Sequence, residues 1–213
     1  PTSVYSDAQL LRGSLMYNNA NDESLTSDAD LDSIQKNIAV HMRAILRELR
    51  IDTDNDPNSR ETAERVAKMY TREIFTGRFS TPPKITVFPN TKQVDQMVVT
   101  GPLTVKSFCS HHFMPIVGQC WVGYIPDASL IGLSKVPRVV EWFSRRPQIQ
   151  EELCEQISGH LYSLLHPKGL GVYIEAQHFC QSHRGVNENP NSLMHTTSLR
   201  GNFQDLSAKQ EFL

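Results

Sequence analysis

The sequence has only four cysteines among its 213 residues, and it contains no long hydrophobic run. Four cysteines are too few to hold a chain of this length together by disulfides. No stretch approaches the roughly 18 consecutive apolar residues of a membrane-spanning helix. The opening residues, PTSVYSDAQL, lack the basic and apolar regions of a secretory signal. These absences predict a soluble cytoplasmic protein with reduced cysteines and no membrane partner.

Neither sign of charge is in excess. The 21 Lys and Arg residues are balanced by 23 Asp and Glu residues, which gives a formal net charge of −2. This balance provides no basis for a protein whose main partner is a nucleic acid. The hydrophobic content of 39% is typical of a globular chain. We therefore expect a folded protein with a sizeable core and no nucleic-acid partner.

The character of the sequence changes twice along its length. Residues 1–30 are polar and rich in Asn, Asp and Ser, so we expect a flexible N-terminus. Apolar residues at helical spacing begin at Leu31 and predict a helical region over 31–83. The patterns of residues 84–213 then predict strands, two helices and further strands. This order favours an α+β fold over a repeating βαβ fold.

The expected elements of residues 84–213 follow from alternation and from proline positions. β-branched residues and alternating polarity predict strands at 84–88, 97–108, 117–125, 171–179 and 194–203. Helical patterns predict two helices, at about 135–146 and 148–165, separated by Pro147.

A stripe of basic residues lies on the second predicted helix of the N-terminal region. Arg65, Lys68 and Arg72 are spaced by three and four residues, so they share one side of the helix. Glu61 and Glu64 lie four residues before Arg65 and Lys68, which favours a solvent-exposed face with i,i+4 ion pairs. An anion-facing stripe is the alternative, and the spacing alone does not support it.

Two of the cysteines lie among histidines. The motif CSHH contains Cys109 and His112 after a predicted strand, and HFC contains Cys180 at the end of another. Thiolate and imidazole are ligands that zinc prefers, and a catalytic site leaves a fourth position for water. His178 and Cys180 are two residues apart, so on a strand they point to the same face. The pattern favours a zinc site that uses Cys109, His112 and Cys180.

The residues alone leave three interpretations of this cluster open. It is a set of reduced cysteines with structural histidines, or a closed structural zinc site with His111 or His178 as fourth ligand, or a catalytic site. In the catalytic case the water pKa falls to roughly 7, and His111 and His178 are suited to moving protons. The basic residues Lys135, Arg138 and Arg184 then suggest a substrate that carries phosphate.

Several motifs of the chain resemble GTP cyclohydrolase I of the type I family. They are FCSHHFMPIVGQ, YIPDASLIGLSKVPRVVEWFSRRPQIQEEL, EAQHFCQSHRGV and the helical segment TAERVAKMYTREIFTG. They occur in family order at family spacing, and the likeness extends from about residue 31 to the C-terminus. The resemblance implies that Cys109, His112 and Cys180 bind zinc and that His111 and His178 are the acid–base histidines.

The resemblance also implies a GTP site. Gln150 and Glu151 match the pair near the guanine, where the carboxylate accepts hydrogen bonds from the ring N–H and amino groups. Ser134 and Lys135 match residues near the ribose as it rearranges. Further contacts to the triphosphate and sugar are implied for the basic residues Arg138, Arg184, Arg65 and Lys68, which favours the anion-facing interpretation of the basic stripe.

For the whole molecule, the resemblance implies a tunnelling fold, with a four-stranded antiparallel sheet and two helices on one face in residues 84–213. It implies a homodecamer of two stacked pentamers with active sites between subunits. The implied reaction converts GTP and water to formate and 7,8-dihydroneopterin triphosphate, at the start of pterin, folate or deazaguanine synthesis. A non-catalytic nucleotide-binding or zinc-stabilised protein is one alternative. A nicotinamide-dependent nitrile reductase is another, but its motif is not evident.

Overall fold

A computed structural model describes residues 28–213 of the chain. The prediction of a flexible N-terminus falls mostly on residues 1–27, which lie outside the described residues. Residues 28–30 form the first turn of helix α2 (Asp28–Glu48). Across the described part of the chain, no helix combines the length and the apolar character needed to cross a bilayer.

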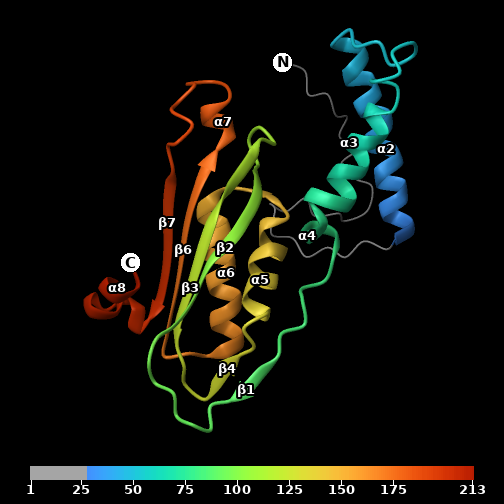
Figure 1. The fold of residues 1–213 in the computed structure, drawn as a ribbon. Coiled ribbons are helices and arrows are strands. Elements are labelled where there is room, and N and C mark those ends of the chain that lie inside the picture. The colour runs from blue at the N-terminus through green and yellow to red at the C-terminus, as the bar shows by residue number, and fades with distance from the viewer. Residues whose placement is uncertain (1–27) are drawn as a thin grey trace, which may run out of the picture.

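The N-terminal region is helical, as its apolar periodicity predicts. Helix α2 packs against α3 (Thr62–Lys68), where Ala63 and Ala67 are buried and allow the two helices to approach closely. Helix α3 continues without a break into a π-helix, η1 (Met69–Ile74), and a short helix, α4 (Thr76–Phe79), follows. Figure 1 shows this group beside the rest of the molecule rather than beneath the sheet.

The main sheet has the strand order β5-β2-β3-β6-β7. Its four long strands, β2 (Val98–Cys109), β3 (Pro115–Ile125), β6 (Gly169–His178) and β7 (Met194–Gly201), pair antiparallel. The predicted four-stranded antiparallel sheet is therefore correct for the long strands but omits β5 (Pro147–Gln148). This two-residue strand pairs parallel with the end of β2. It lies where the sequence predicted only a break between two helices, because Pro147 ends the preceding helix and leaves the chain extended.

A separate two-stranded ribbon connects the helical region to the sheet. Strand β1 (Val87–Pro89) pairs with β4 (Ser129–Ile131). The predicted strand at 84–88 is therefore too early by about three residues. Residues 84–86 are not in a strand, although the Gly132 N–H donates a hydrogen bond to the Thr86 carbonyl oxygen (3.1 Å).

Helices α5 (Lys135–Ser144) and α6 (Gln150–Leu165) cover one face of the sheet, as predicted (Figure 1). Alternate strand residues face them and form a fully buried core, represented by Val105, Cys120 and Ile174 from the sheet and by Val139 and Leu161 from the helices. On the other face, Phe203 of the 3₁₀ turn η2 (Asn202–Gln204) and Phe212 of α8 (Leu206–Phe212) pack over the glycines of β3 and β6.

The helical region docks on the C-terminal end of α5. The Gly77 N–H donates to the Arg145 carbonyl oxygen at 3.1 Å, and the Trp142 indole N–H donates to the Ser80 carbonyl oxygen at 3.2 Å. A Cβ atom on Gly77 would lie 2.0 Å from the Trp142 carbonyl oxygen, so only glycine permits this approach. The contact fixes α4 relative to α5 and to the sheet end that follows it.

Candidate active site

Three segments that are distant in sequence meet at one end of the sheet: the β2–β3 hairpin, the start of α6 and the end of β6. Strand β2 ends at Cys109, and β6 ends at His178, which is paired with Ile116 at the start of β3. Strand β5 pairs with β2 at Cys109 and Gln148, which places the N-terminus of α6 at the same end. Figure 1 shows α7 (Phe179–Ser182) and the β2–β3 hairpin tip at this end. The sheet topology therefore brings together the Cys- and His-rich motifs.

The β2–β3 hairpin loop holds the CSHH motif. The Cys109 N–H donates to the Met114 carbonyl oxygen (2.8 Å), and the Phe113 N–H donates to the Cys109 carbonyl oxygen (2.9 Å). Phe113 has a φ of 52°, and its ring lies 5.7 Å from that of Phe75 in the helical region. These contacts close the loop and leave His111 and His112 exposed on it.

The structure brings Cys109, His112 and Cys180 together as predicted. Their ligand atoms all lie within 4.8 Å of one another, and within residues 28–213 they form the group able to hold a metal ion. Zinc bonds of about 2.0–2.3 Å place neighbouring ligands roughly 3.5–4 Å apart, so small side-chain rotations suffice. Two thiols and one imidazole fit zinc, and the group does not include His111 or His178.

The charged side chain of Arg184 lies beside this group. Burial and the neighbouring Cys109 thiol raise the pKa of the Cys180 thiol, and Arg184 opposes this effect. The Arg184 guanidinium donates to Nε2 of His112 at 3.0 Å. A divalent cation between the thiols would favour their thiolate forms. Arg184 therefore places a cation at the edge of the cluster, within reach of an anionic ligand.

His178 lies beside this cluster and contacts the start of α6. Its Nε2 is 2.8 Å from the amide oxygen of Gln150. Partial burial lowers the pKa of His178, and the nearby Glu151 carboxylate opposes this shift. Glu151 itself is exposed in the first turn of α6. A histidine and a carboxylate are thus available next to the candidate metal ligands.

Three other predicted site residues lie elsewhere in the chain. Ser134, at the start of α5, lines a surface hollow together with Leu103 of β2. Cys109 is six residues further along the same strand, a distance of about 20 Å in extended chain. Lys135 and Arg138 follow Ser134 on α5. Within one copy of the chain, Ser134 is therefore separate from the candidate metal ligands.

Two of the three residues of the basic stripe form ion pairs, Arg65 with Glu61 and Arg72 with Asp32 of α2. Arg65 is exposed and forms an ion pair with Glu61 at 2.9 Å, as predicted. The predicted pairing of Glu64 with Lys68 is wrong, because Glu64 instead contacts Arg43 of α2. Sequence spacing identifies partners on one helix but not partners on a neighbouring one.

The two remaining cysteines belong to the core, as predicted. Burial raises the pKa of the Cys154 thiol to about 12, and it also raises that of Cys120. Both thiols are thus inert.

Sequence reasoning missed the residues that hold Gln150. Its amide nitrogen donates to the carbonyl oxygens of Ile174 and Met194 and to the hydroxyl of Thr196. Two of these partners are backbone atoms, and all three lie on strands more than twenty residues away, so the sequence carries no signal that would identify them.

Comparisons with known proteins identify relatives that match most of the chain. A family model described as GTP cyclohydrolase I matches residues 38–213. The GTP cyclohydrolase 1 of Aeromonas hydrophila is 40% identical over 214 residues, which cover 100% of this chain and 97% of the relative. The GTP cyclohydrolase 1 of Haemophilus ducreyi is 38% identical over 212 residues, which cover 99% and 96% of the two chains.

One solved structure also matches part of the fold. The crystal structure of the archaeosine synthase QueF-Like in the apo form is 14% identical with a TM-score of 0.40, covering 51% of this chain and 94% of that one. The family assignment rests on the sequence matches, which extend over most of the chain and include the Cys, His and Glu residues gathered at the sheet end. The chain belongs to the GTP cyclohydrolase I family of enzymes.

Proposed function

We propose that the chain converts GTP and water to formate and 7,8-dihydroneopterin triphosphate, the first step of pterin synthesis, with zinc as its metal. The observation that carries this proposal is the group of Cys109, His112 and Cys180 beside His178 and Glu151, in a chain of a family that acts on GTP. The direct test is to incubate purified protein with GTP. Equal amounts of formate and of a pterin that fluoresces after oxidation are expected, and GTP left unchanged would contradict the proposal.

The donor set determines what a metal would contribute. Cys109, His112 and Cys180 would hold the ion, and their softness favours zinc over magnesium or calcium. When bound, such an ion supplies Lewis acidity that makes water acidic enough to attack an electron-poor carbon near neutral pH. Three protein ligands are consistent with a site that keeps one position open to solvent or substrate.

The chain's own side chains would handle the purine and its protons. His178 would exchange a proton with the imidazole ring of the purine, since an imidazole changes protonation near neutral pH. His111, exposed on the hairpin loop, would be the second proton carrier. The Glu151 carboxylate would accept hydrogen bonds from the guanine ring N–H and amino group. Arg184 would meet the anionic part of the nucleotide.

Substitution of Glu151 by glutamine is expected to reduce kcat/KM for GTP by roughly 100-fold or more, because an amide N–H would replace an acceptor that faces two donors. Steady-state kinetics with GTP measure this effect. Glu152→Gln is the matched control, since it makes the same charge change on the next residue of α6. Unchanged kinetics of the Glu151→Gln protein would remove this carboxylate from the site.

We also propose that a complete GTP site uses more than one copy of the chain, in a ring-shaped homo-oligomer of the tunnelling fold, as in the predicted decamer of two pentamers. The sheet supports this proposal because it has two open edges. Within residues 28–213, β7 pairs only with β6, and β2 has β5 beside its last two residues alone. The first and last of four antiparallel strands run in opposite directions. Thus β2 of a second copy would continue the antiparallel order beside β7.

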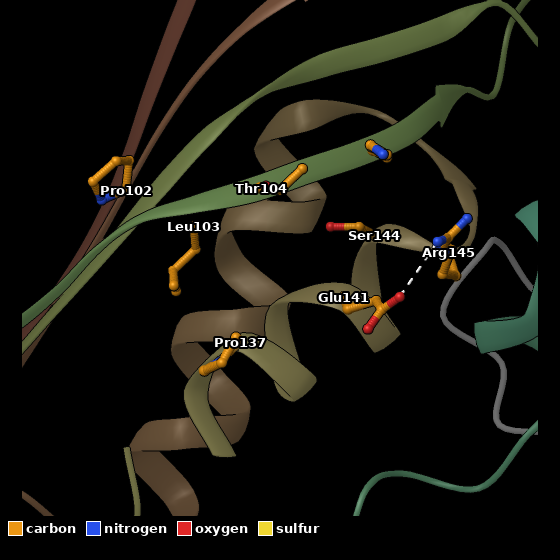
Figure 2. A pocket seen from close by; sticks show the side chains of 8 residues that line it. Pro102, Leu103, Thr104, Pro137, Glu141, Ser144 and Arg145 are labelled. Atoms are coloured by element: carbon orange, nitrogen blue, oxygen red, sulfur yellow. Dashed lines mark hydrogen bonds and ion pairs between the residues drawn. The ribbon is translucent and has the colours of Figure 1, made fainter. Parts of the chain in front are cut away.

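A groove follows the open edge of β2. Its volume is about 440 Å³, and it lies between β2 and α5. Figure 2 shows Leu103 and Thr104 on the strand side, and Pro137, Glu141 and Arg145 on the helix side, where Arg145 and Glu141 form an ion pair at 3.3 Å. The groove is contiguous with the hollow at Ser134, because Leu103 and Pro137 line both. A neighbouring copy added at this edge would bring its own residues next to Ser134, Lys135 and Arg138.

A mixing experiment tests the shared site. Cys109→Ser and Arg138→Ala proteins are each expected to be nearly inactive with GTP. Co-expressed in equal amounts, they should regain about a quarter of the wild-type activity, because half of the copies supply an intact Cys109 and half of their neighbours an intact Arg138. GTP turnover of the co-purified mixture measures this. Activity no higher than that of the single variants would place the whole site within one chain.

A further inference from the structure

The side chain of Gln150 is buried and fully engaged at the first residue of α6. It is only 1% exposed. Its amide nitrogen lies 3.2 Å from the Ile174 carbonyl oxygen, 3.0 Å from the Met194 carbonyl oxygen and 3.1 Å from Thr196 Oγ1. These acceptors belong to β6 and β7, so the amide ties the start of α6 to two strands of the sheet.

The three acceptors fix which way the amide faces. Backbone carbonyl oxygens accept hydrogen bonds and cannot donate them. A flipped amide would place its oxygen against the carbonyls of Ile174 and Met194, which would cost a buried hydrogen bond and add repulsion. The amide oxygen of Gln150 must therefore face the other direction, where His178 Nε2 lies 2.8 Å away.

This orientation decides the tautomer of His178. An amide oxygen is an acceptor only, so Nε2 of His178 must carry the hydrogen of the contact. In the neutral imidazole, Nδ1 then keeps its lone pair. The His178 residue is only partly buried, whereas the Gln150 side chain is enclosed.

We infer that Gln150 is a positioning residue, which holds the His178 ring with its hydrogen on Nε2 and leaves the lone pair of Nδ1 able to accept a hydrogen bond. The family resemblance implies that Gln150 lies near the guanine. In this chain, however, its side-chain polar atoms are directed into the protein, toward the sheet and His178. The proton-exchange role rests on the proposed function, whereas the orientation of the ring does not.

Replacement of Gln150 by methionine tests the inference, because methionine has a similar length but neither accepts nor donates a strong hydrogen bond. We expect kcat to fall about 10- to 100-fold. This loss is smaller than the roughly 10²–10⁴-fold rate acceleration of a positioned acid–base group, because the variant keeps His178 itself. The dissociation constant for GTP should change by less than about threefold. A loss of GTP affinity as large as the loss of kcat would indicate direct guanine contact and overturn the inference, as would an unchanged kcat.

Nitrogen-15 solid-state NMR of histidine-labelled protein provides a readout independent of turnover. Wild-type protein should show His178 with its hydrogen on Nε2 alone, and the signal is assigned by its loss in His178→Ala. The Gln150→Met protein should show a mixture of the two tautomers. A wild-type spectrum with the hydrogen on Nδ1 would overturn the inference even if Gln150→Met failed to fold.

Gln177→Met is the matched control. It makes the same change on Gln177, the residue before His178. The side-chain amide of Gln177 donates to Ser182 Oγ at 3.4 Å rather than to the His178 ring. It should leave the His178 signal unchanged. If wild-type protein does not convert GTP, the proposed function fails, but the NMR measurement still decides how Gln150 orients His178.

Discussion

Substitution of Cys109 by serine is expected to remove the metal and the GTP turnover together. A serine hydroxyl is not deprotonated near neutral pH, so the site would keep one thiolate and one imidazole, too few to hold zinc firmly. Loss of a residue that only hydrogen-bonds to a metal ligand already lowers metal affinity or activity about 10–100-fold. Loss of a ligand itself should therefore lower turnover by more than about 100-fold. Elemental analysis of zinc per chain and the formate assay measure the two effects on the same sample.

Cys154→Ala is the control for this prediction, because that thiol is buried in the core, away from the candidate metal ligands. It should keep its zinc, although it will lose some stability. A Cys109→Ser or Cys180→Ala protein that retained full zinc would contradict the proposed ligand set. Removal of zinc from wild-type protein by a chelator should abolish turnover, and added zinc should restore it.

The candidate metal ligands could be predicted from the sequence because each lies in a short motif. The CSHH motif lies in one hairpin loop, where the hydrogen bonds between Cys109, Phe113 and Met114 set its shape. Cys180 follows the next long strand, which pairs with the first residues of β3 and so ends beside that loop. Alternation predicted the three strands, and their antiparallel pairing in the structure brings the motifs to one sheet end.

The remaining features depend on contacts between segments that the sequence does not relate. Pairing of Glu64 with Arg43 needs the crossing of α2 and α3, which helical periodicity does not specify. Strand β5 has only two residues, too few for any alternation to be visible. The contact of Gln150 with His178 depends on carbonyl groups of β6 and β7, and every residue type offers a backbone carbonyl.

The separation of Ser134 from the cluster was also outside sequence reasoning. The resemblance implied that Ser134, Lys135 and Arg138 meet the same substrate as the metal ligands. In one copy of the chain, Ser134 shares a hollow with Leu103, which lies about 20 Å along β2 from Cys109 if an extended strand rises about 3.3 Å per residue. This distance exceeds what a side chain can span. We therefore propose that another copy of the chain supplies part of the site, and the mixing experiment tests this proposal.

Replacement of His178 by alanine is expected to separate binding from chemistry. The ring lies outside the group of Cys109, His112 and Cys180, so its loss should leave zinc content, assembly and most of the GTP affinity intact. The variant should fail in proton transfer, and turnover should fall roughly 10²–10⁴-fold. Zinc analysis, GTP binding and the formate assay on this one protein provide the three measurements.

A second variant guards against an indirect effect of the alanine. His178→Ala leaves the buried amide oxygen of Gln150 without its donor, which by itself costs about 1–3 kcal/mol of stability if water does not replace the contact. His178→Gln keeps an N–H group that can donate to this oxygen but cannot exchange a proton near neutral pH. We expect it to be as inactive as the alanine variant, yet more stable. If either variant lost its zinc, His178 would be a fourth ligand in a closed structural site, and the proton-transfer role proposed for it would be wrong.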